Sequence, residues 1–242
     1  MSTFVLIHGA WHGAWCWYKV AARLEAAGHS VIVPDLPGHG LDRTPTVDVG
    51  LDTYVNSICA LLDEVAEPVV LVGHSMGGAV ITQVAEHRPE KIKTLVYLAA
   101  FLLEDGMSLF AEAAKDSETM IPQVLVPRDD GTAVCKQELI RDVFYGDCSD
   151  DDVRLARSLL VPQSLRVFKT PVSLTQERFG TVDRVYIEAT QDKAISLHAQ
   201  RLMTAAQPCR EIVTLEASHS PFLSQPQAVV DALINASHGP AQ

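Results

Sequence analysis

The stretch Val69-Val70-Leu71-Val72-Gly73-His74-Ser75-Met76-Gly77-Gly78-Ala79-Val80 decides the fold. Its first four residues are β-branched or leucine and predict a short buried strand, while the apolar periodicity that continues to His87 predicts a helix. Glycines flank one serine between these two elements, at the spacing G-x-S-x-G. The stretch therefore predicts a strand, a sharp turn and a helix, with Ser75 at the turn.

A turn this tight holds its central residue in a strained backbone conformation, so the residues two before and two after must be small. Gly73 and Gly77 meet this requirement. The turn lifts the Ser75 hydroxyl above the end of the sheet, and the start of the next helix favours negative charge there. A glycine-rich turn whose serine only caps the helix is the alternative. The stretch resembles the nucleophile elbow of the α/β-hydrolase family.

Composition indicates one soluble globular domain. A chain of 242 residues that is 48% hydrophobic can bury a large core, with or without an inserted lid. The formal net charge of -11 argues against nucleic acid or an anionic membrane as main partner and favours small neutral ligands. The longest apolar run, 95–103, is half a membrane span, and no signal-peptide pattern opens the chain.

The arrangement of the cysteines indicates the cellular compartment. All five are scattered, without a C-x-x-C pair, which fits reduced thiols that serve in packing. We therefore expect a cytoplasmic protein. A homodimer is left open beside a monomer.

Strand and helix patterns alternate along most of the chain, which predicts a parallel sheet with helices on both faces. We expect the strands in the order 2-1-3-4-5-6, which brings the first and third together at a switch point. The expected strands cover residues 3–7, 30–34, 69–72, 93–99, 182–189 and 210–215. Three expected helices cover residues 51–66, 194–206 and 225–237, and two more end at residues 27 and 87.

Residues 102–180 interrupt this alternation. They carry no strand signal that we recognise and have helical patterns at 107–116, 134–143 and 150–160, separated by prolines. We therefore expect a core domain of 1–101 and 181–242, with a helical cap inserted after the fourth strand. Most apolar residues of the cap would pack against the core, and a few would form an apolar pocket over the serine. The candidates are Trp11, Phe101, Met107, Phe110 and Leu125.

A nucleophilic serine needs a base, and the base needs a carboxylate that orients it. In an open parallel sheet these groups should follow strands, because ligands bind at the carboxyl ends. His219 follows the sixth strand and Asp192 follows the fifth, which gives the chain order Ser, Asp, His of this architecture. Asp192 could instead cap the helix predicted from 194, and His219 could bond the backbone.

Other candidates fit less well. Glu104 and Asp105, just past the fourth strand, are the reserve acid. His8 and His12 are four residues apart, but they lie in a loop without a third ligand, so we expect no metal and no cofactor. Four histidines are weaker rivals of His219, because they lie in a helix, the tail, an early loop or beside the serine: His198, His238, His39 and His74.

Attack on a carbonyl also requires donors for the developing negative oxygen. Backbone N–H groups serve well because they are fixed in advance. We expect Met76 N–H, at the start of the helix, and Ala10 N–H, in the loop after the first strand. The alternative for this loop is a plain strand-to-helix turn.

The chain resembles one branch of the α/β hydrolases in four segments: 4–18, 73–78, 98–101 and 188–194. This branch contains plant methyl esterases, salicylate-binding esterases and hydroxynitrile lyases, with bacterial relatives. The resemblance implies a sheet without the family's first two antiparallel strands and a triad of Ser75, Asp192 and His219. The lyases carry threonine and lysine where this chain has Gly9 and Ser220, so lyase activity is not implied. Halide-removing relatives carry aspartate in place of the serine, so dehalogenation is disfavoured.

These residues together predict a cofactor-free serine hydrolase that cleaves carboxylic esters with an apolar part through an acyl-enzyme. The expected partner is a small-molecule ester, with neither nucleic acid nor a membrane. Three alternatives remain: a ligand-binding receptor or sensor with slow turnover, a lactone hydrolase, and a hydrolase of carbon–carbon bonds.

Overall fold

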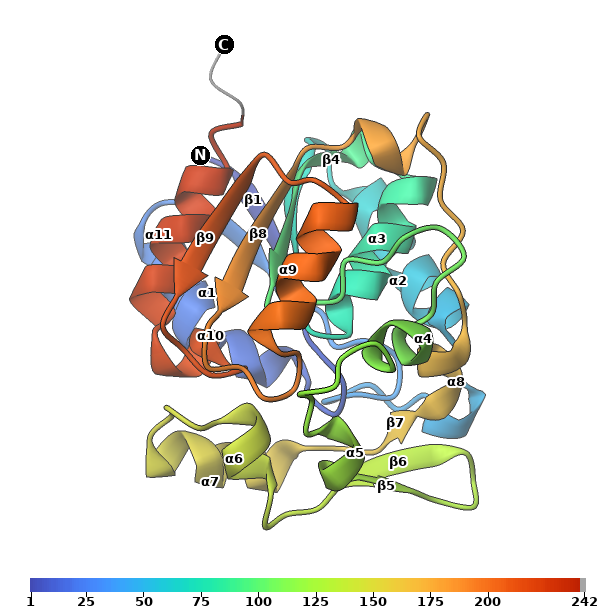
Figure 1. Cartoon of the computed structure of the whole chain (residues 1–242). Coiled ribbons are helices and arrows are strands. Elements are labelled where there is room, and N and C mark those ends of the chain that lie inside the picture. Colours follow the sequence, from blue (N-terminus) through green and yellow to red (C-terminus); the bar gives the residue numbers. More distant parts are fainter. Residues whose placement is uncertain (240–242) are drawn as a thin grey trace.

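A six-stranded parallel sheet forms the centre of the molecule (Figure 1). The computed structural model describes residues 1–239. The strand order, β2-β1-β3-β4-β8-β9, confirms the order expected from the sequence. The strands are β1 Thr3–Ile7, β2 Ser30–Ile32, β3 Val69–His74, β4 Ile92–Leu98, β8 Arg184–Ala189 and β9 Glu211–Leu215.

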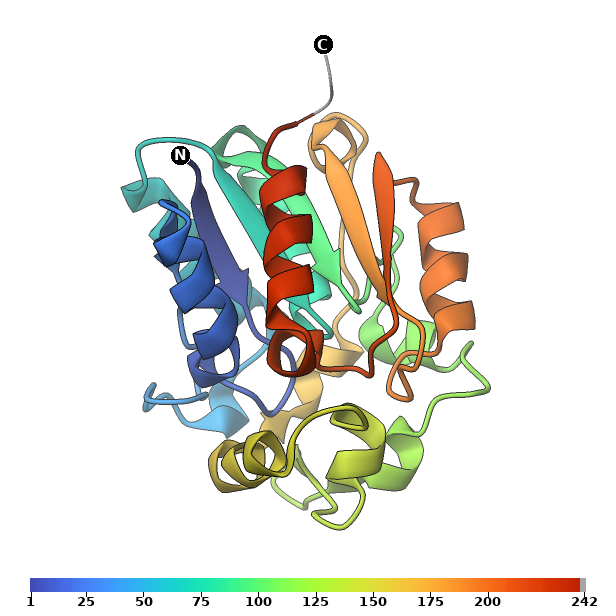
Figure 2. The same ribbon diagram turned by 90° about the vertical axis from the view of Figure 1, so that its left-hand side faces the viewer.

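Helices cover both faces of this sheet (Figure 2). Helices α1 and α11 pack together on one face, and α2, α3 and α9 lie on the other. Because both faces are covered, β3 is buried along its whole length and reads as a continuous apolar run. The helices are α1 Tyr18–Ala26, α2 Leu51–Glu64, α3 Gly77–His87, α9 Leu197–Ala206, α10 Pro221–Ser224 and α11 Pro226–Ala236, with 3₁₀ turns η1 Ala14–Trp17, η2 Thr46–Asp48, η3 Pro89–Lys91 and η4 Phe179–Thr181.

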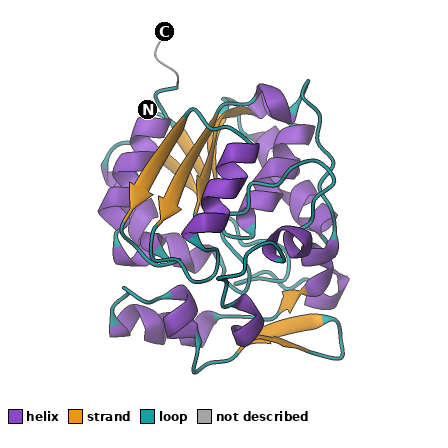
Figure 3. Ribbon diagram, in the orientation of Figure 1, coloured by secondary structure: helices purple, strands orange, loops and turns teal. Residues whose placement is uncertain are grey.

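The insertion after β4 contains strands as well as helices (Figure 3). Its strands form a separate antiparallel sheet in the order β5-β6-β7, which was not predicted from the sequence. The insertion lies across the carboxyl ends of the central strands, where it can cover a site (Figure 1). Its elements are α4 Leu109–Ala113, α5 Ile121–Val124, β5 Leu125–Pro127, β6 Thr132–Cys135, α6 Ile140–Phe144, α7 Asp150–Leu159, β7 Gln163–Ser164 and α8 Leu165–Lys169.

The helix expected over 134–143 is therefore wrong in its first part, where the chain is strand β6. A turn reverses the chain between β5 and β6, and its last residue, Gly131, has a φ of 81° that favours glycine. The pair Asp130-Gly131 is a known hairpin signal. The helix itself begins only at Ile140, because Cys135 and Val134 are paired with Leu125 and Val126 across the hairpin.

Among residues 1–239, three non-glycine residues adopt the left-handed backbone region, and all three follow neighbouring strands. Trp11 follows β1 with a φ of 63°, Ser75 follows β3 with 53°, and Ala99 follows β4 with 43°. Each such residue costs on the order of 1–3 kcal/mol, so the surrounding structure must hold it in place. The strained backbone conformations thus lie at the same edge of the sheet that the insertion covers.

The glycines around Ser75 are required by close packing. A Cβ on Gly73 would lie 2.6 Å from the carbonyl oxygen of Gly77, and a Cβ on Gly77 would lie 2.9 Å from that of His8. A Cβ on Gly78 would collide with the carbonyl oxygen of Phe101. The expected tight turn is confirmed, and its glycines let β3, α3 and the loop after β1 meet.

Two further findings concern the chain as a whole. Within residues 1–239, no helix combines the length and apolar character needed to cross a bilayer. All five cysteines are free thiols, and four of them are buried.

Candidate active site

Ser75 stands at the turn between β3 and α3. Its carbonyl oxygen accepts hydrogen bonds from Gly78 N–H at 3.0 Å and Phe101 N–H at 3.1 Å, which fixes the turn from two sides. The neighbouring residues His74 and Met76 are buried, but Ser75 itself is partly exposed. Ser75 is thus accessible from the pocket that it lines.

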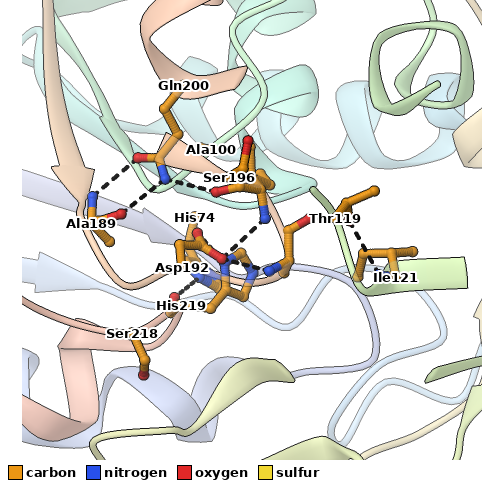
Figure 4. Close-up of polar contacts among 12 residues, drawn as sticks. His74, Ala100, Thr119, Ile121, Ala189, Asp192, Ser196, Gln200, Ser218 and His219 are labelled. Atoms are coloured by element: carbon orange, nitrogen blue, oxygen red, sulfur yellow. Dashed lines mark hydrogen bonds and ion pairs between the residues drawn. The ribbon is translucent and has the colours of Figure 1, made fainter. Parts of the chain in front are cut away.

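His219 and Asp192 form a buried hydrogen-bonded pair in the loops after β9 and β8 (Figure 4). Nδ1 of His219 lies 2.7 Å from Oδ2 of Asp192, and the side chains are 2% and 0% exposed. A carboxylate can only accept, so Nδ1 carries the proton. This leaves Nε2 of the neutral imidazole free to accept a proton from another group.

The second oxygen of Asp192 binds the backbone. Oδ1 accepts from Ala194 N–H at 2.7 Å and from Ile195 N–H at 3.0 Å. The capping role that was the alternative for Asp192 is therefore fulfilled together with its bond to His219. Helix α9 itself begins later than expected, at Leu197.

The loop that carries Asp192 is fastened on both sides (Figure 4). Gln200 on α9 bonds both backbone groups of Ala189, at 3.0 and 3.1 Å. On the opposite side, Thr119 of the insertion donates to Ala194 O at 2.7 Å, and Met120 N–H donates to Lys193 O at 2.8 Å. These bonds fix the carboxylate before any ligand arrives.

His74 holds the other loop. Its Nε2 donates to the backbone carbonyl of His219 at 2.8 Å, and the two rings are 4.6 Å apart (Figure 4). Burial, and next the nearby imidazole of His219, keep the pKa of His74 well below its ordinary value. His74 is therefore a neutral donor that joins strand β3 to the loop after β9.

Three more buried histidines lie under this edge, and their ring nitrogens are engaged. His8 accepts from Leu36 N–H at 3.1 Å and donates to Gly9 O at 2.8 Å. His12 bonds Ala10 O at 2.8 Å and the Tyr145 hydroxyl at 2.7 Å. Within residues 1–239, no group of three side chains is arranged to hold a metal ion.

His39 continues the same network away from the serine. Its Nδ1 lies 2.7 Å from His12 O, and its Nε2 lies 2.8 Å from the hydroxyl of Tyr54. Burial lowers the pKa of His39, and likewise that of His12, from 6.5 to about 4. The sequence reading did not place these groups together, because they lie far apart along the chain.

The structure does not join all three predicted catalytic residues by hydrogen bonds. Asp192 and His219 are bonded, whereas the described residues include no hydrogen bond between Ser75 and His219. The His219 ring nevertheless packs against the ring of His74, the residue next to Ser75. Such bonds are often long in a ligand-free hydrolase and shorten when substrate binds.

Ala10 and Met76, the expected oxyanion donors, flank Ser75 in one pocket. Among the described residues, neither N–H has a backbone or side-chain acceptor. Both residues are nearly buried, at 5% and 1% exposure. Two uncommitted N–H groups beside a hydroxyl are suited to stabilise negative charge on a carbonyl oxygen.

The pocket above Ser75 spans about 400 Å³, part of which is open to solvent, and its lining is apolar apart from the serine. Three of the residues expected there line it: Trp11, Phe101 and Phe110. The other two, Met107 and Leu125, are not among its lining residues; they pack against the core instead. The sequence reading missed four further lining residues, all from the insertion: Leu109, Ala113, Ile121 and Phe168.

The reserve acids, Glu104 and Asp105, do not approach the His219–Asp192 pair. Glu104 and Asp105 are exposed. Oδ1 of Asp105 instead accepts from Leu174 N–H at 2.8 Å, a bond between two loops.

Known proteins resemble this chain in sequence and in fold. Residues 4–232 match the family described as "Alpha/beta hydrolase family". The chain belongs to the α/β-hydrolase family. This hydrolase is 34% identical to salicylic acid-binding protein 2 from Nicotiana tabacum, over 97% of this chain and 96% of that protein.

Two further relatives define the branch. A pyrethroid hydrolase from Sphingobium wenxiniae is 31% identical over 100% of this chain and 90% of its own length. The crystal structure of methylesterase MES16 from Arabidopsis superposes with a TM-score of 0.85 at 30% identity, covering 98% of this chain and 99% of that one. This α/β hydrolase is thus esterase-like and lies in the methylesterase branch with bacterial relatives.

Proposed function

We propose that this α/β hydrolase cleaves carboxylic esters with an apolar moiety, with Ser75 as nucleophile. The observation that carries the proposal is that Ser75 stands on a strained turn, lines an apolar pocket and directly follows His74, whose ring packs against that of the Asp192-bonded His219. A conformation that costs free energy is retained where it serves function.

The proposed reaction has two halves. Ser75 Oγ attacks the ester carbonyl while Nε2 of His219 takes the hydroxyl proton, and Ala10 and Met76 N–H hold the oxyanion. The proton then passes to the departing alcohol, which leaves an acyl group on Ser75. Water, deprotonated by His219, releases the acid and restores the serine. Asp192 orients His219 throughout.

The pocket supports a neutral, apolar substrate group. Every side chain around it except Ser75 is apolar, so a charged group placed there would lose its hydration without gaining a partner. Relatives named for methyl ester and pyrethroid hydrolysis agree with this class of substrate.

The test is a panel of p-nitrophenyl esters, methyl esters and lactones, run with wild type and Ser75→Ala. Steady turnover that Ser75→Ala abolishes supports the proposal. A single burst with a tightly retained product would favour a receptor or sensor, for which the salicylic acid-binding relative is a precedent by name. Undiminished turnover in Ser75→Ala would refute Ser75 as nucleophile.

A further inference from the structure

A second cavity lies behind the substrate pocket. It encloses about 620 Å³ beside the β5–β6 hairpin and the segment after α7, and part of this space is open to solvent. Its lining combines apolar side chains with the polar side chains of Arg128 and Gln137. Trp11 is the one residue that lines both this cavity and the pocket above Ser75.

Trp11 is fixed in this position by four contacts. Its indole N–H donates to Ala133 O at 3.0 Å, and its carbonyl oxygen accepts from Val161 N–H at 2.9 Å. Its ring packs against Phe144 and Phe168, with centroids 5.7 and 5.8 Å away. Trp11 is only 4% exposed, although cavities lie on two of its sides.

The backbone of Trp11 is also constrained. Its φ of 63° is strained for a bulky residue, and it directly follows the proposed oxyanion donor Ala10. The Trp11 side chain, which is held between the two cavities by a strained backbone, acts as a partition between them. Without it, the apolar pocket would extend past the hairpin into the second cavity.

We propose that Trp11 sets the length of the apolar group that the enzyme accepts, by closing the substrate pocket from the cavity behind it. This inference rests on the proposed ester hydrolysis. The wild-type enzyme takes esters whose apolar group fits the pocket above Ser75. Removal of the indole admits longer linear acyl or alcohol chains, whose distal methylenes would lie among Val134, Leu160 and Val161 in the second cavity.

The experiment measures kcat/KM for p-nitrophenyl butyrate, octanoate and dodecanoate with wild type, Trp11→Ala and Trp11→Phe. Trp11→Ala should raise the ratio of dodecanoate to butyrate kcat/KM by about tenfold or more, because one or a few buried methylenes suffice for such a change. Trp11→Phe keeps a smaller aromatic ring as partition and lacks the indole N–H, so its ratio should stay much closer to the wild-type ratio than that of Trp11→Ala. An equal change in both variants would overturn the proposal in favour of the hydrogen bond to Ala133.

A second pair of variants tests where the longer chain lies. Val134→Phe fills the rear cavity without touching the pocket above Ser75. In the Trp11→Ala background it should remove the gained dodecanoate activity and leave butyrate hydrolysis in place. Persistence of that gain would refute the second cavity as the binding place. Thermal melting of each variant identifies misfolding, and Trp11→Leu replaces Trp11→Ala if the latter does not fold.

The failure of this inference is distinct from the failure of the proposed function. If no ester is hydrolysed in a Ser75-dependent way, the proposed function fails. If hydrolysis depends on Ser75 but chain-length preference does not respond to Trp11→Ala, only the role of Trp11 is wrong.

Discussion

The imidazole of His74 donates a hydrogen bond to the backbone carbonyl of His219, at 2.8 Å. The residue before Ser75 therefore holds the loop that carries His219, although 145 positions separate His74 from His219 in sequence. This bond is a structural link between β3 and the loop after β9 that does not pass through substrate.

We expect His74→Leu to lower kcat by about 100-fold with little change in KM, because loss of the bond lets the imidazole of His219 shift away from the serine. The backbone carbonyl of His219, left without its donor, also lowers the stability of the protein by about 1–3 kcal/mol. His74→Asn, which offers an amide donor, should recover part of kcat. The control is His87→Ala, at an exposed position on α3. Equal losses in His74→Asn and His74→Leu would contradict a role for the donor.

Asp192→Asn separates the two tasks of this carboxylate. The amide oxygen can still accept from Ala194 and Ile195, but the amide nitrogen facing His219 favours the wrong imidazole tautomer. We expect kcat to fall by about 10⁴-fold while the protein still folds. Asp105→Asn, at the exposed acid after β4, is the matched control and should retain kcat. Steady-state kinetics and thermal melting measure both quantities; a kcat near wild type in Asp192→Asn would exclude it as the orienting acid.

Stability should decline in mild acid because of the buried histidines. The pKa of His12 and that of His39 are each lowered from 6.5 to about 4 in the folded state, chiefly by burial. The unfolded chain therefore binds these protons first, so stability is complete above about pH 6.5 and is lost as pH falls toward about 4. Each histidine contributes about 3 kcal/mol to this loss.

Urea unfolding at a series of pH values between neutrality and about pH 4 measures the effect. His12→Asn, which keeps an amide donor for Ala10 O but cannot be protonated, should show a shallower decline than wild type. A decline of equal slope in both proteins would show that other groups control acid unfolding.

The strained backbone at Ser75 predicts that glycine at this position gives a more stable protein than alanine. Ser75→Ala and Ser75→Gly both remove the hydroxyl, but only glycine adopts a φ of 53° without steric cost. We expect Ser75→Gly to be more stable than Ser75→Ala by about 1 kcal/mol in urea unfolding. At Ser57, inside helix α2, the same pair should show the opposite order, with glycine less stable by about 1 kcal/mol. The same order at both sites would argue against strain at Ser75.

The sequence predicted the parts of the molecule that follow local rules. The apolar runs that form β1, β3 and β4 and the glycine spacing around Ser75 fixed the sheet order and the tight turn. Asp192 and His219 could be paired in advance because parallel strands end at one edge of the sheet.

The insertion was less predictable, since its elements are short and depend on packing. Strand β5 has only three residues and ends at Pro127, so its pattern carried little information. Asp130-Gly131 was a usable hairpin signal. Ile121 and Phe168 reach the pocket through tertiary folding, and no local pattern marks them.

The insertion is bonded to both loops that flank Ser75, through Trp11 on one side and through the Thr119–Ala194 bond on the other. Swinging it outward as a rigid body would break these bonds and displace Ala10 and Asp192 together. We therefore expect substrate to enter by rotation of individual side chains such as Phe110, which is 37% exposed and lines the pocket. Rotamer changes of exposed side chains take picoseconds to nanoseconds, so entry should not limit the rate of turnover.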